Sequence, residues 1–168
     1  MGVYIIAEAG VNHNGSFDLA CRLVDAAKAA GADCIKFQTF RARNLVSRNA
    51  GKADYQKDTT GDGSQADMLT KLELSYDAFS RLKQYCEEVG ITFLSTPFDL
   101  ESAAFLDQLG VPFWKIPSGE VTNLPYLERI AALKKPVILA LNMMDIVEKN
   151  GDKIDIKALG DKLGCEVV

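Results

Sequence analysis

Short apolar runs alternate along the chain with longer stretches whose apolar residues recur every three or four positions. In the first of these stretches, Ala20, Leu23 and Ala27 fall on one face of a helix. Strands that alternate with amphipathic helices predict βαβ units and a parallel sheet. We therefore expect an α/β fold whose parallel sheet is built from about five βα units. The strand-like runs lie at residues 3–7, 34–37, 91–94, 113–116 and 136–141.

The predicted helices begin at side chains that can accept hydrogen bonds from free backbone amides, and several end at glycine. The segment 41–70 is polar and shows little periodicity. It is longer than an ordinary connection, which is typical of functional loops. The expected N-caps are Ser16, Ser75, Asp99, Asn123 and Asp155, and the expected C-terminal stops are Gly31, Gly90, Gly110 and Gly164.

The run 137–141 is apolar at every position, which is typical of a strand that is buried on both faces. The predicted helix after Asp155 presents Ile156, Leu159 and Leu163 as a stripe that can cover such a sheet. We expect residues 136–141 to form a central strand and residues 1–168 to fold as a single α/β domain. The favoured architecture is one open, doubly wound parallel sheet, and a half barrel that dimerises is the alternative.

The composition is that of an ordinary globular domain. Hydrophobic residues make up 48% and charged residues 25% of the 168 residues, and the net charge of -4 argues against a nucleic-acid partner. No apolar run approaches the ~20 residues needed to span a bilayer, and the N-terminus lacks the basic region of a signal peptide. The four cysteines have no metal-ligand spacing. We therefore expect a cytoplasmic protein with reduced thiols and no membrane contact.

Polar side chains gather where the predicted strands end, and in parallel α/β folds this edge of the sheet binds ligands. Lysines and hydroxyls can hold a phosphate or a carboxylate there. Carboxylates can orient sugar hydroxyls or move protons. A small anionic substrate rich in hydroxyls is therefore expected. The candidate residues are Glu8, Lys36, Gln38, Thr96, Lys115, Ser118 and Glu120.

The same residues also have structural interpretations. A single lysine or glutamate at a strand end is commonly a solvated charge, and His13, the only histidine, fits a hydrogen-bonded loop residue. The spacing of Gly10 and Gly15 imitates a P-loop, but Ser16 stands where the phosphate-binding lysine is required. What favours an anion site is the shared polar character of four strand ends.

Five motifs carry a resemblance to a known family, and they occur in that family's order. They are IAEAGVNHNGS, IKFQTF, NAGKADYQKDTTG, FLSTPFD and KIPSGEVTNLP. Together they resemble the N-acetylneuraminate (sialic and legionaminic acid) synthase family over about residues 3–140. The resemblance implies that residues 1–140 form half of a TIM barrel. It also implies a reaction that condenses phosphoenolpyruvate with an N-acetylated amino sugar and uses a divalent metal, Mn or Mg.

The resemblance further implies roles for individual residues. Glu8 and Glu120 look like catalytic carboxylates. The family's metal-binding histidines lie beyond the matched region, so no metal ligand and no cofactor is expected in this chain. The positions that look like phosphoenolpyruvate contacts are Lys36, Thr96, Lys115 and Ser118, and those that look like sugar contacts are Gln38, Tyr55 and Glu120.

The chain departs from the family pattern after the run that begins at residue 136. Residues 136–168 resemble the GTPase domain of bacterial ferrous iron transport protein B, and Asn142 and Asp145 look like its guanine-recognition motif. A junction inside a strand that both families tolerate favours a constructed chimera over a natural recombinant. That reading predicts a synthase-derived fragment or chimera that is inactive alone and binds at most phosphoenolpyruvate or small anions.

Two other functions are kept as alternatives. One is a working synthase that a partner chain, such as a second copy in a homodimer, completes. The other is a guanine-nucleotide binder that uses Asn142 and Asp145. The missing histidine pair argues against the first and the missing P-loop against the second.

Overall fold

The structure, a computed structural model, describes residues 2–46, 64–138, 144–155, 157–158 and 161. The chain divides into two compact units, Met1–Ile138 and Leu139–Val168. The division falls inside the predicted strand 136–141, close to residue 140, where the resemblance to the synthase family is expected to end. The assignment of residues 1–168 to a single domain stays a prediction.

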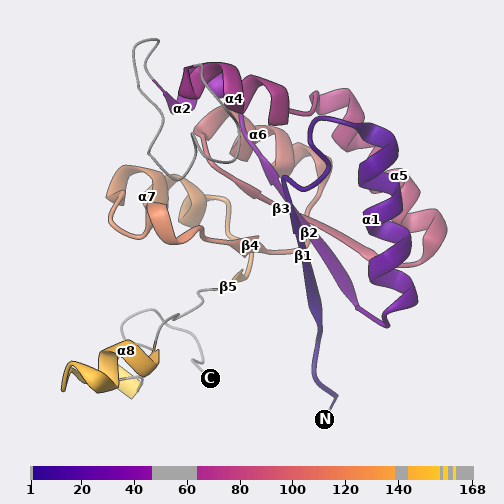
Figure 1. Cartoon of the computed structure of the whole chain (residues 1–168). Helices are drawn as coiled ribbons and strands as arrows, with labels where there is room; N and C mark the ends of the chain where they lie inside the picture. Colours follow the sequence, from indigo (N-terminus) through magenta and orange to yellow (C-terminus); the bar gives the residue numbers. More distant parts are fainter. Residues whose placement is uncertain (1, 47–63, 139–143, 156, 159–160, 162–168) are drawn as a thin grey trace. The chain divides into compact units, whose positions relative to one another are not determined.

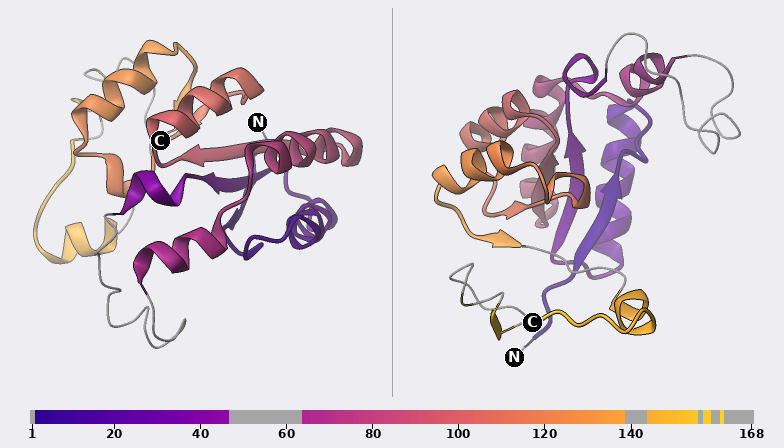
Figure 2. Two further views of the ribbon diagram at one scale, coloured as in Figure 1. Left: turned by 90° about the horizontal axis from the view of Figure 1, so that it is seen from above. Right: turned by 90° about the vertical axis from the view of Figure 1, so that its left-hand side faces the viewer.

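The first unit is built on parallel strands, as predicted. Strands β1 (Ile6–Gly10), β2 (Cys34–Thr39) and β3 (Thr92–Pro97) form a three-stranded sheet in that order. Strands β4 (Trp114–Lys115) and β5 (Val137–Ile138) form a second, two-stranded parallel pair. The arrows of β2 and β3 point the same way in each of the further views (Figure 2). The α/β class with parallel sheets is confirmed.

The strand order differs from the doubly wound sheet that we expected. A doubly wound sheet reverses its order at a switch point. Here β1 and β3 lie on opposite sides of β2, and β4 contacts β3, so the chain advances in the same direction from β1 to β4. No reversal occurs among the strands that the structure describes. This progression in chain order is that of a barrel, and it places successive strand ends side by side.

The main helices begin and end where the sequence predicts. Helices α1 (Phe17–Ala29) and α5 (Tyr76–Val89) pack side by side (Figure 1). Helix α6 (Leu100–Leu109) follows β3, and α7 (Leu124–Ala132) packs against α6. The predicted caps are confirmed, since amides of the first turns donate to the side chains of Ser16, Ser75, Asp99 and Asn123.

The polar segment 41–70 contains two helices that the sequence analysis missed. These are α2 (Ala42–Leu45) and α4 (Gln65–Leu72). Helix α4 begins with a capping box, in which the Ser64 hydroxyl accepts from the Asp67 amide and the Asp67 carboxylate accepts from the Ser64 amide. None of the residues of α4 is buried, and its eight residues are fewer than the roughly 11–18 over which helical periodicity can be judged from sequence.

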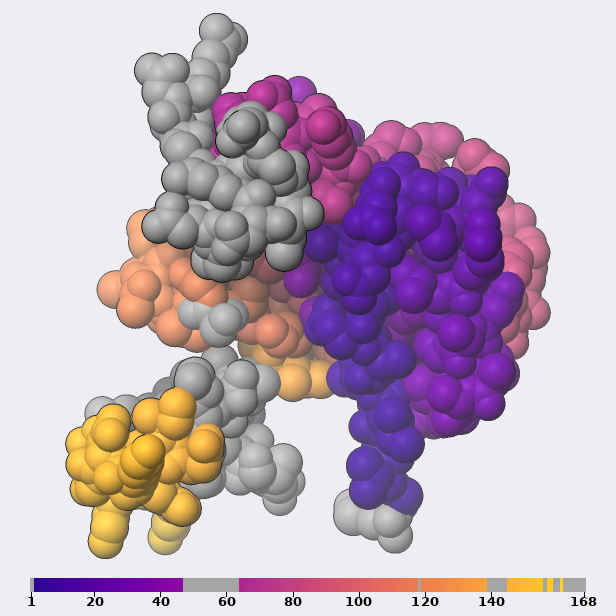
Figure 3. Space-filling model, in the orientation of Figure 1, coloured from indigo at the N-terminus to yellow at the C-terminus, as the bar shows by residue number. Residues whose placement is uncertain are grey.

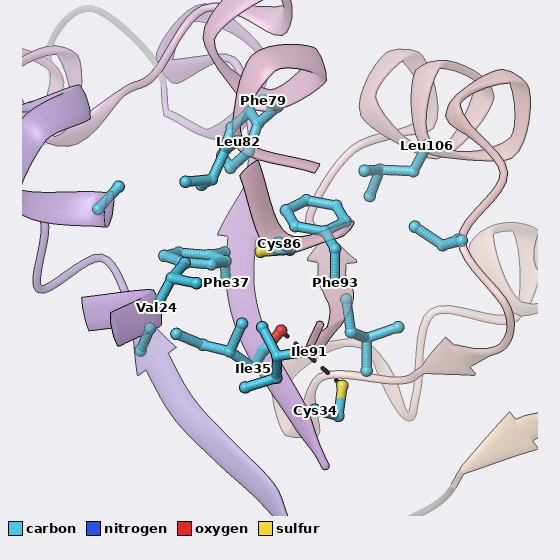
Figure 4. Packing of buried hydrophobic residues seen from close by; sticks show 14 of the residues in the cluster. Val24, Cys34, Ile35, Phe37, Phe79, Leu82, Cys86, Ile91, Phe93 and Leu106 are labelled. Atoms are coloured by element: carbon cyan, nitrogen blue, oxygen red, sulfur yellow. Dashed lines mark hydrogen bonds between the residues drawn. The ribbon is translucent and has the colours of Figure 1, made fainter. Parts of the chain in front are cut away.

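One face of the three-stranded sheet packs against helices to form the core (Figure 4). The rings of Phe37 and Phe93 stack across β2 and β3 with their centroids 6.0 Å apart. Phe79 of α5 meets Phe93 edge-on, and Leu82 and Val24 close the layer between α5 and α1. Since side chains alternate along a strand, the neighbours of Phe37 in sequence point to the opposite face.

Strand β5 corrects one expectation. It pairs in parallel with β4, as predicted. Its residues Val137 and Ile138 are 44% and 37% exposed, however, so the expected burial on both faces is wrong for them. The physical reason is that β4 is the strand that β5 pairs with in the described part of the chain, which leaves its other edge unpaired. Residues 139–141 lie outside the described residues.

The chain ends are described in part. The residues ahead of β1 project from the packed body (Figure 3), and Val3 is 86% exposed. In the second unit, α8 (Met144–Lys149) is helical, and the Asp155 carboxylate accepts from the amide of Ala158, as expected of an N-cap. The predicted stop at Gly164 lies outside the described residues. No helix in the described part of the chain is long and apolar enough to cross a membrane.

Candidate active site

Strand β1 contains a β-bulge directly after Glu8, a residue of the polar face of the sheet. Glu8 pairs in register with Lys36, but Gly10 pairs with Phe37, so Ala9 is an extra residue in β1. Glu8 and Lys36 are direct partners in the regular register that precedes the bulge, and Oε2 of Glu8 lies 2.5 Å from Nζ of Lys36. The side chain of Lys36 is 7% exposed and that of Glu8 is 54% exposed. The buried ammonium therefore has an exposed counter-ion at the mouth of the site.

Gly10 leaves open the space beside this ion pair. A Cβ at this position would lie 3.3 Å from Oε1 of Glu8 and 3.4 Å from Nε2 of Gln38. Both side chains therefore lie over the backbone of Gly10, whose φ of +55° also favours glycine. The structure brings Glu8 and Gln38 together from neighbouring strands.

Thr96 stands opposite Gln38 in the register of β2 and β3, so both side chains leave the same face of the sheet. The residue is 1% exposed. Its Oγ1 is buried without a hydrogen-bond partner among the described residues. Buried hydroxyls normally have partners, so this free hydroxyl is available to a ligand that enters the site.

Lys115 reaches the same group of charges from β4. Burial lowers the pKa of its ammonium, and the charge of Lys36 lowers it further, while Glu8 partly opposes both effects. The three charges are therefore within electrostatic reach of one another. Two partly or fully buried ammonium groups beside a free hydroxyl can bind an anion with more than one negative charge.

The other candidates are placed less closely. The Glu120 carboxylate accepts from Nδ2 of Asn123 at 2.6 Å, at the start of α7, and no contact in the described structure joins it to the lysines. Ser118 lies in a 3-10 helix, η1 (Ser118–Glu120), but its side chain is outside the described residues, as are Tyr55 and Asn142. Asp145 is an exposed residue of α8.

His13 belongs to the packed layer and not to the polar face. The ring is fully buried, 6.1 Å from the ring of Phe37, and Nδ1 accepts from the amide of Gly15 at 3.1 Å. Burial lowers the pKa of His13 to about 4. The neutral ring with its proton on Nε2 fits these contacts, which agrees with the interpretation of His13 as a hydrogen-bonded loop residue.

Sequence reasoning missed a polar cluster at the same edge of the sheet. Nη1 of Arg41 lies 2.6 Å from Oε1 of Glu73, whose Oε2 accepts from the amide of Ala42 at 2.8 Å. The guanidinium also lies 3.6 Å from the centroid of the Tyr76 ring, and the amide of Arg41 donates to Asp99. The sequence could have indicated Arg41, because it closely follows the polar end of β2. Glu73 lies in no periodic pattern, so the sequence could not have indicated it.

A divalent metal finds no ready site in the described part of the chain. No group of three or more His, Cys, Asp and Glu side chains there is placed to hold a metal ion. Glu8, the carboxylate closest to the lysines, is already in contact with Lys36. The described residues therefore do not fit a metal centre.

The comparisons with known proteins agree with the geometry. The sequence pattern of the NeuB family matches residues 23–154. The chain is 52% identical over 145 residues to the N,N'-diacetyllegionaminic acid synthase of Campylobacter jejuni and 50% identical over 149 residues to that of Legionella pneumophila. These matches cover 86% and 88% of the chain, but 43% and 42% of the two relatives. The chain thus spans about two fifths of the length of these relatives.

A solved structure shows the same relationship. The N-acetylneuraminic acid synthetase of Leptospira borgpetersenii, determined with citrate, superposes with a TM-score of 0.68 at 30% identity. The superposition covers 90% of this chain and 52% of the synthetase.

The family match includes much of the C-terminal segment. The family match runs through residue 154, past the proposed junction at 136–141 and past Asn142 and Asp145. None of these findings supports a GTPase-like segment or a chimera. Because the match extends over most of the chain, the protein belongs to the NeuB family.

Proposed function

We propose that this chain carries the phosphoenolpyruvate-binding half of the active site of a nonulosonic acid synthase. The observation that carries the proposal is the electrostatic proximity of Lys36 and Lys115, with the free hydroxyl of Thr96 on the same face of the neighbouring strand. Phosphoenolpyruvate bears both a phosphate and a carboxylate, and two ammonium groups with a hydroxyl donor match such a ligand.

The product of the complete enzyme is proposed to be an N,N'-diacetyllegionaminic acid. The chain is 52% and 50% identical to two synthases named for that product, against 30% for the sialic acid synthetase structure. The second substrate is then an amino sugar with two N-acetyl groups. Gln38 and Glu8, which lie together over Gly10, are the side chains best placed to meet its hydroxyl and amide groups.

The proposed reaction is a condensation. C3 of phosphoenolpyruvate attacks the aldehyde carbon of the open-chain sugar, water adds at C2, and the C–O bond breaks to release phosphate and leave a ketone. Lys36 and Lys115 hold the anion and stabilise the charge of the leaving phosphate. The divalent metal that the resemblance implies would supply a Lewis acid. The chain spans about two fifths of the length of its synthase relatives, and its described residues do not fit a metal centre. We therefore expect it to bind phosphoenolpyruvate without turnover.

Calorimetric titration of phosphoenolpyruvate tests the proposal. Wild-type chain is expected to bind it, and Lys115→Met is expected to weaken binding by about tenfold, the effect of one charge-assisted contact. Lys135→Met is the matched control, since Lys135 contacts Asp107 of α6 and the ring of Trp114, which alternates with Lys115 in β4. Absence of binding, or equal losses in the two variants, would refute the proposed site.

A further inference from the structure

The two residues of the Glu8–Lys36 ion pair differ in their exposure to solvent, and the proposed reaction does not explain this difference. Lys36 is buried within β2, whereas the Glu8 side chain is more than half exposed on the bulge of β1. A buried ammonium without a counter-ion is costly, so Lys36 needs an anion near it at all times. Glu8 meets this need in the ligand-free protein, and it can leave without being buried elsewhere.

We propose that Glu8 is an exchangeable counter-ion for Lys36, which an entering anionic substrate displaces. The inference rests on the proposed function, because it concerns the same anion site. A phosphate or carboxylate that reaches Lys36 competes with Glu8 for one ammonium, and two carboxylate-like anions at that distance repel each other. Glu8 therefore lowers the affinity of the site for phosphoenolpyruvate by competing with it, and does not itself contact that substrate.

The surroundings of Glu8 allow this exchange. The bulge gives β1 one residue more than β2 at this point, and Gly10 has no side chain to block the movement of the Glu8 carboxylate. Oε1 of Glu8 already lies on the Gln38 side of Gly10. Displacement from Lys36 leaves the carboxylate free beside Gln38, as an acceptor for hydroxyl or amide donors of the second substrate.

Lys115 favours the substrate over Glu8 as the counter-ion of Lys36. In the ligand-free site one exposed carboxylate faces two ammonium groups, and the repulsion between Lys36 and Lys115 is only partly offset. A dianionic or trianionic ligand neutralises both lysines, which Glu8 alone does not. The ligand therefore outcompetes Glu8 in spite of the short contact that it must break.

Titration of phosphoenolpyruvate into Glu8→Gln tests the inference. The amide keeps the shape of the side chain but is a weak competitor for Lys36, so the dissociation constant should fall by about tenfold relative to wild type near neutral pH. Glu128→Gln, which removes the same charge from an exposed position on α7, controls for the net charge and should leave the affinity unchanged. Thermal unfolding confirms that the variants are folded.

The outcomes separate the two proposals. Binding to wild type that is unchanged or weaker in Glu8→Gln refutes the exchange and leaves the anion site standing. No binding to wild type or variant refutes the anion site, and the exchange with it. NMR of the Lys36 ammonium gives a second readout. Its signal should shift on the Glu8→Gln substitution, and it should also shift when phosphoenolpyruvate is added to the wild-type chain. A Lys36 signal unmoved by Glu8→Gln would show that the ion pair does not form.

Discussion

The guanidinium of Arg41 and the carboxylate of Glu73 meet at 2.6 Å, and this ion pair joins the end of β2 to the segment that follows α4. The side chains are 19% and 22% exposed. The second oxygen of Glu73 accepts from the amide of Ala42, the first residue of α2. One carboxylate thereby fixes the start of α2 and the exit of α4 at the ligand-binding edge of the sheet.

Replacing this carboxylate should destabilise the fold. Glu73→Gln weakens two charge-assisted hydrogen bonds, and we expect the free energy of unfolding to fall by about 2 kcal/mol. Glu101→Gln removes the exposed contact with Arg43 and should change it little. Urea denaturation of the two variants measures the difference, and equal effects would show that Glu73 does not hold these helices.

Gly15 should tolerate no side chain. A Cβ there would lie 2.4 Å from the carbonyl oxygen of Lys71, and the φ of +74° already disfavours alanine. Gly31→Ala carries a similar φ without a clash and should cost about 1 kcal/mol, whereas Gly15→Ala should cost about 3 kcal/mol. Hydrogen exchange should show the additional loss of protection in α4. Equal costs for the two alanine variants would contradict this contact.

The buried His13 should make stability fall in acid. Its pKa is about 4 in the folded chain against an ordinary 6.5, so the unfolded chain takes up the proton at higher pH. The stabilisation is complete above pH 6.5 and is lost as the pH falls towards 4, by about 3 kcal/mol.

Two measurements check this pH dependence. Because His13 is the only histidine, its ring signals can be followed without assignment and should titrate near the lowered pKa. His13→Gln should remove that part of the acid destabilisation while the carboxylates still titrate. A midpoint at the ordinary value for histidine would show that the ring is accessible to water.

Two threonines of the sheet should respond in opposite ways to the loss of a hydroxyl. Thr96→Val removes a buried hydroxyl without a described partner, so the ligand-free chain should be as stable or up to about 1 kcal/mol more stable, yet bind phosphoenolpyruvate more weakly. Thr39→Val breaks a buried hydrogen bond of 2.7 Å to Ser95 and should cost about 1 kcal/mol. A Thr96→Val variant that is the less stable of the two would place a structural partner on that hydroxyl.

The sequence predicted the repeating parts of the fold and the residues at strand ends. Alternation of apolar runs and helical stripes predicted the parallel strands, and acceptor side chains predicted the five N-caps. It did not predict the strand order, because periodicity shows which face of a strand is buried but not which strand lies beside it. Helix α4 was missed because its eight residues are too few for helical periodicity to stand out within a polar segment.

The site was predicted in the same partial way. Lys36, Gln38 and Thr96 share a face because strands alternate, which can be read from residue spacing. The contact between Glu8 and Lys36 could not, since it depends on the register of β1 against β2, which residue spacing within one strand does not reveal. The resemblance of residues 136–168 to a GTPase rested on a short apolar run and a brief motif, which many parallel α/β proteins share, and the longer family match does not support it.

We propose above all that phosphoenolpyruvate binds at the carboxyl ends of β1 to β4. Backbone amide NMR during a titration with phosphoenolpyruvate tests it most directly, because the position of binding is read residue by residue. We expect the largest shifts at residues 36–38, 94–97 and 114–116, with no shifts on the outer surfaces of α1 and α5. Absence of shifts, or shifts confined to α1, α5 or α8, would contradict it.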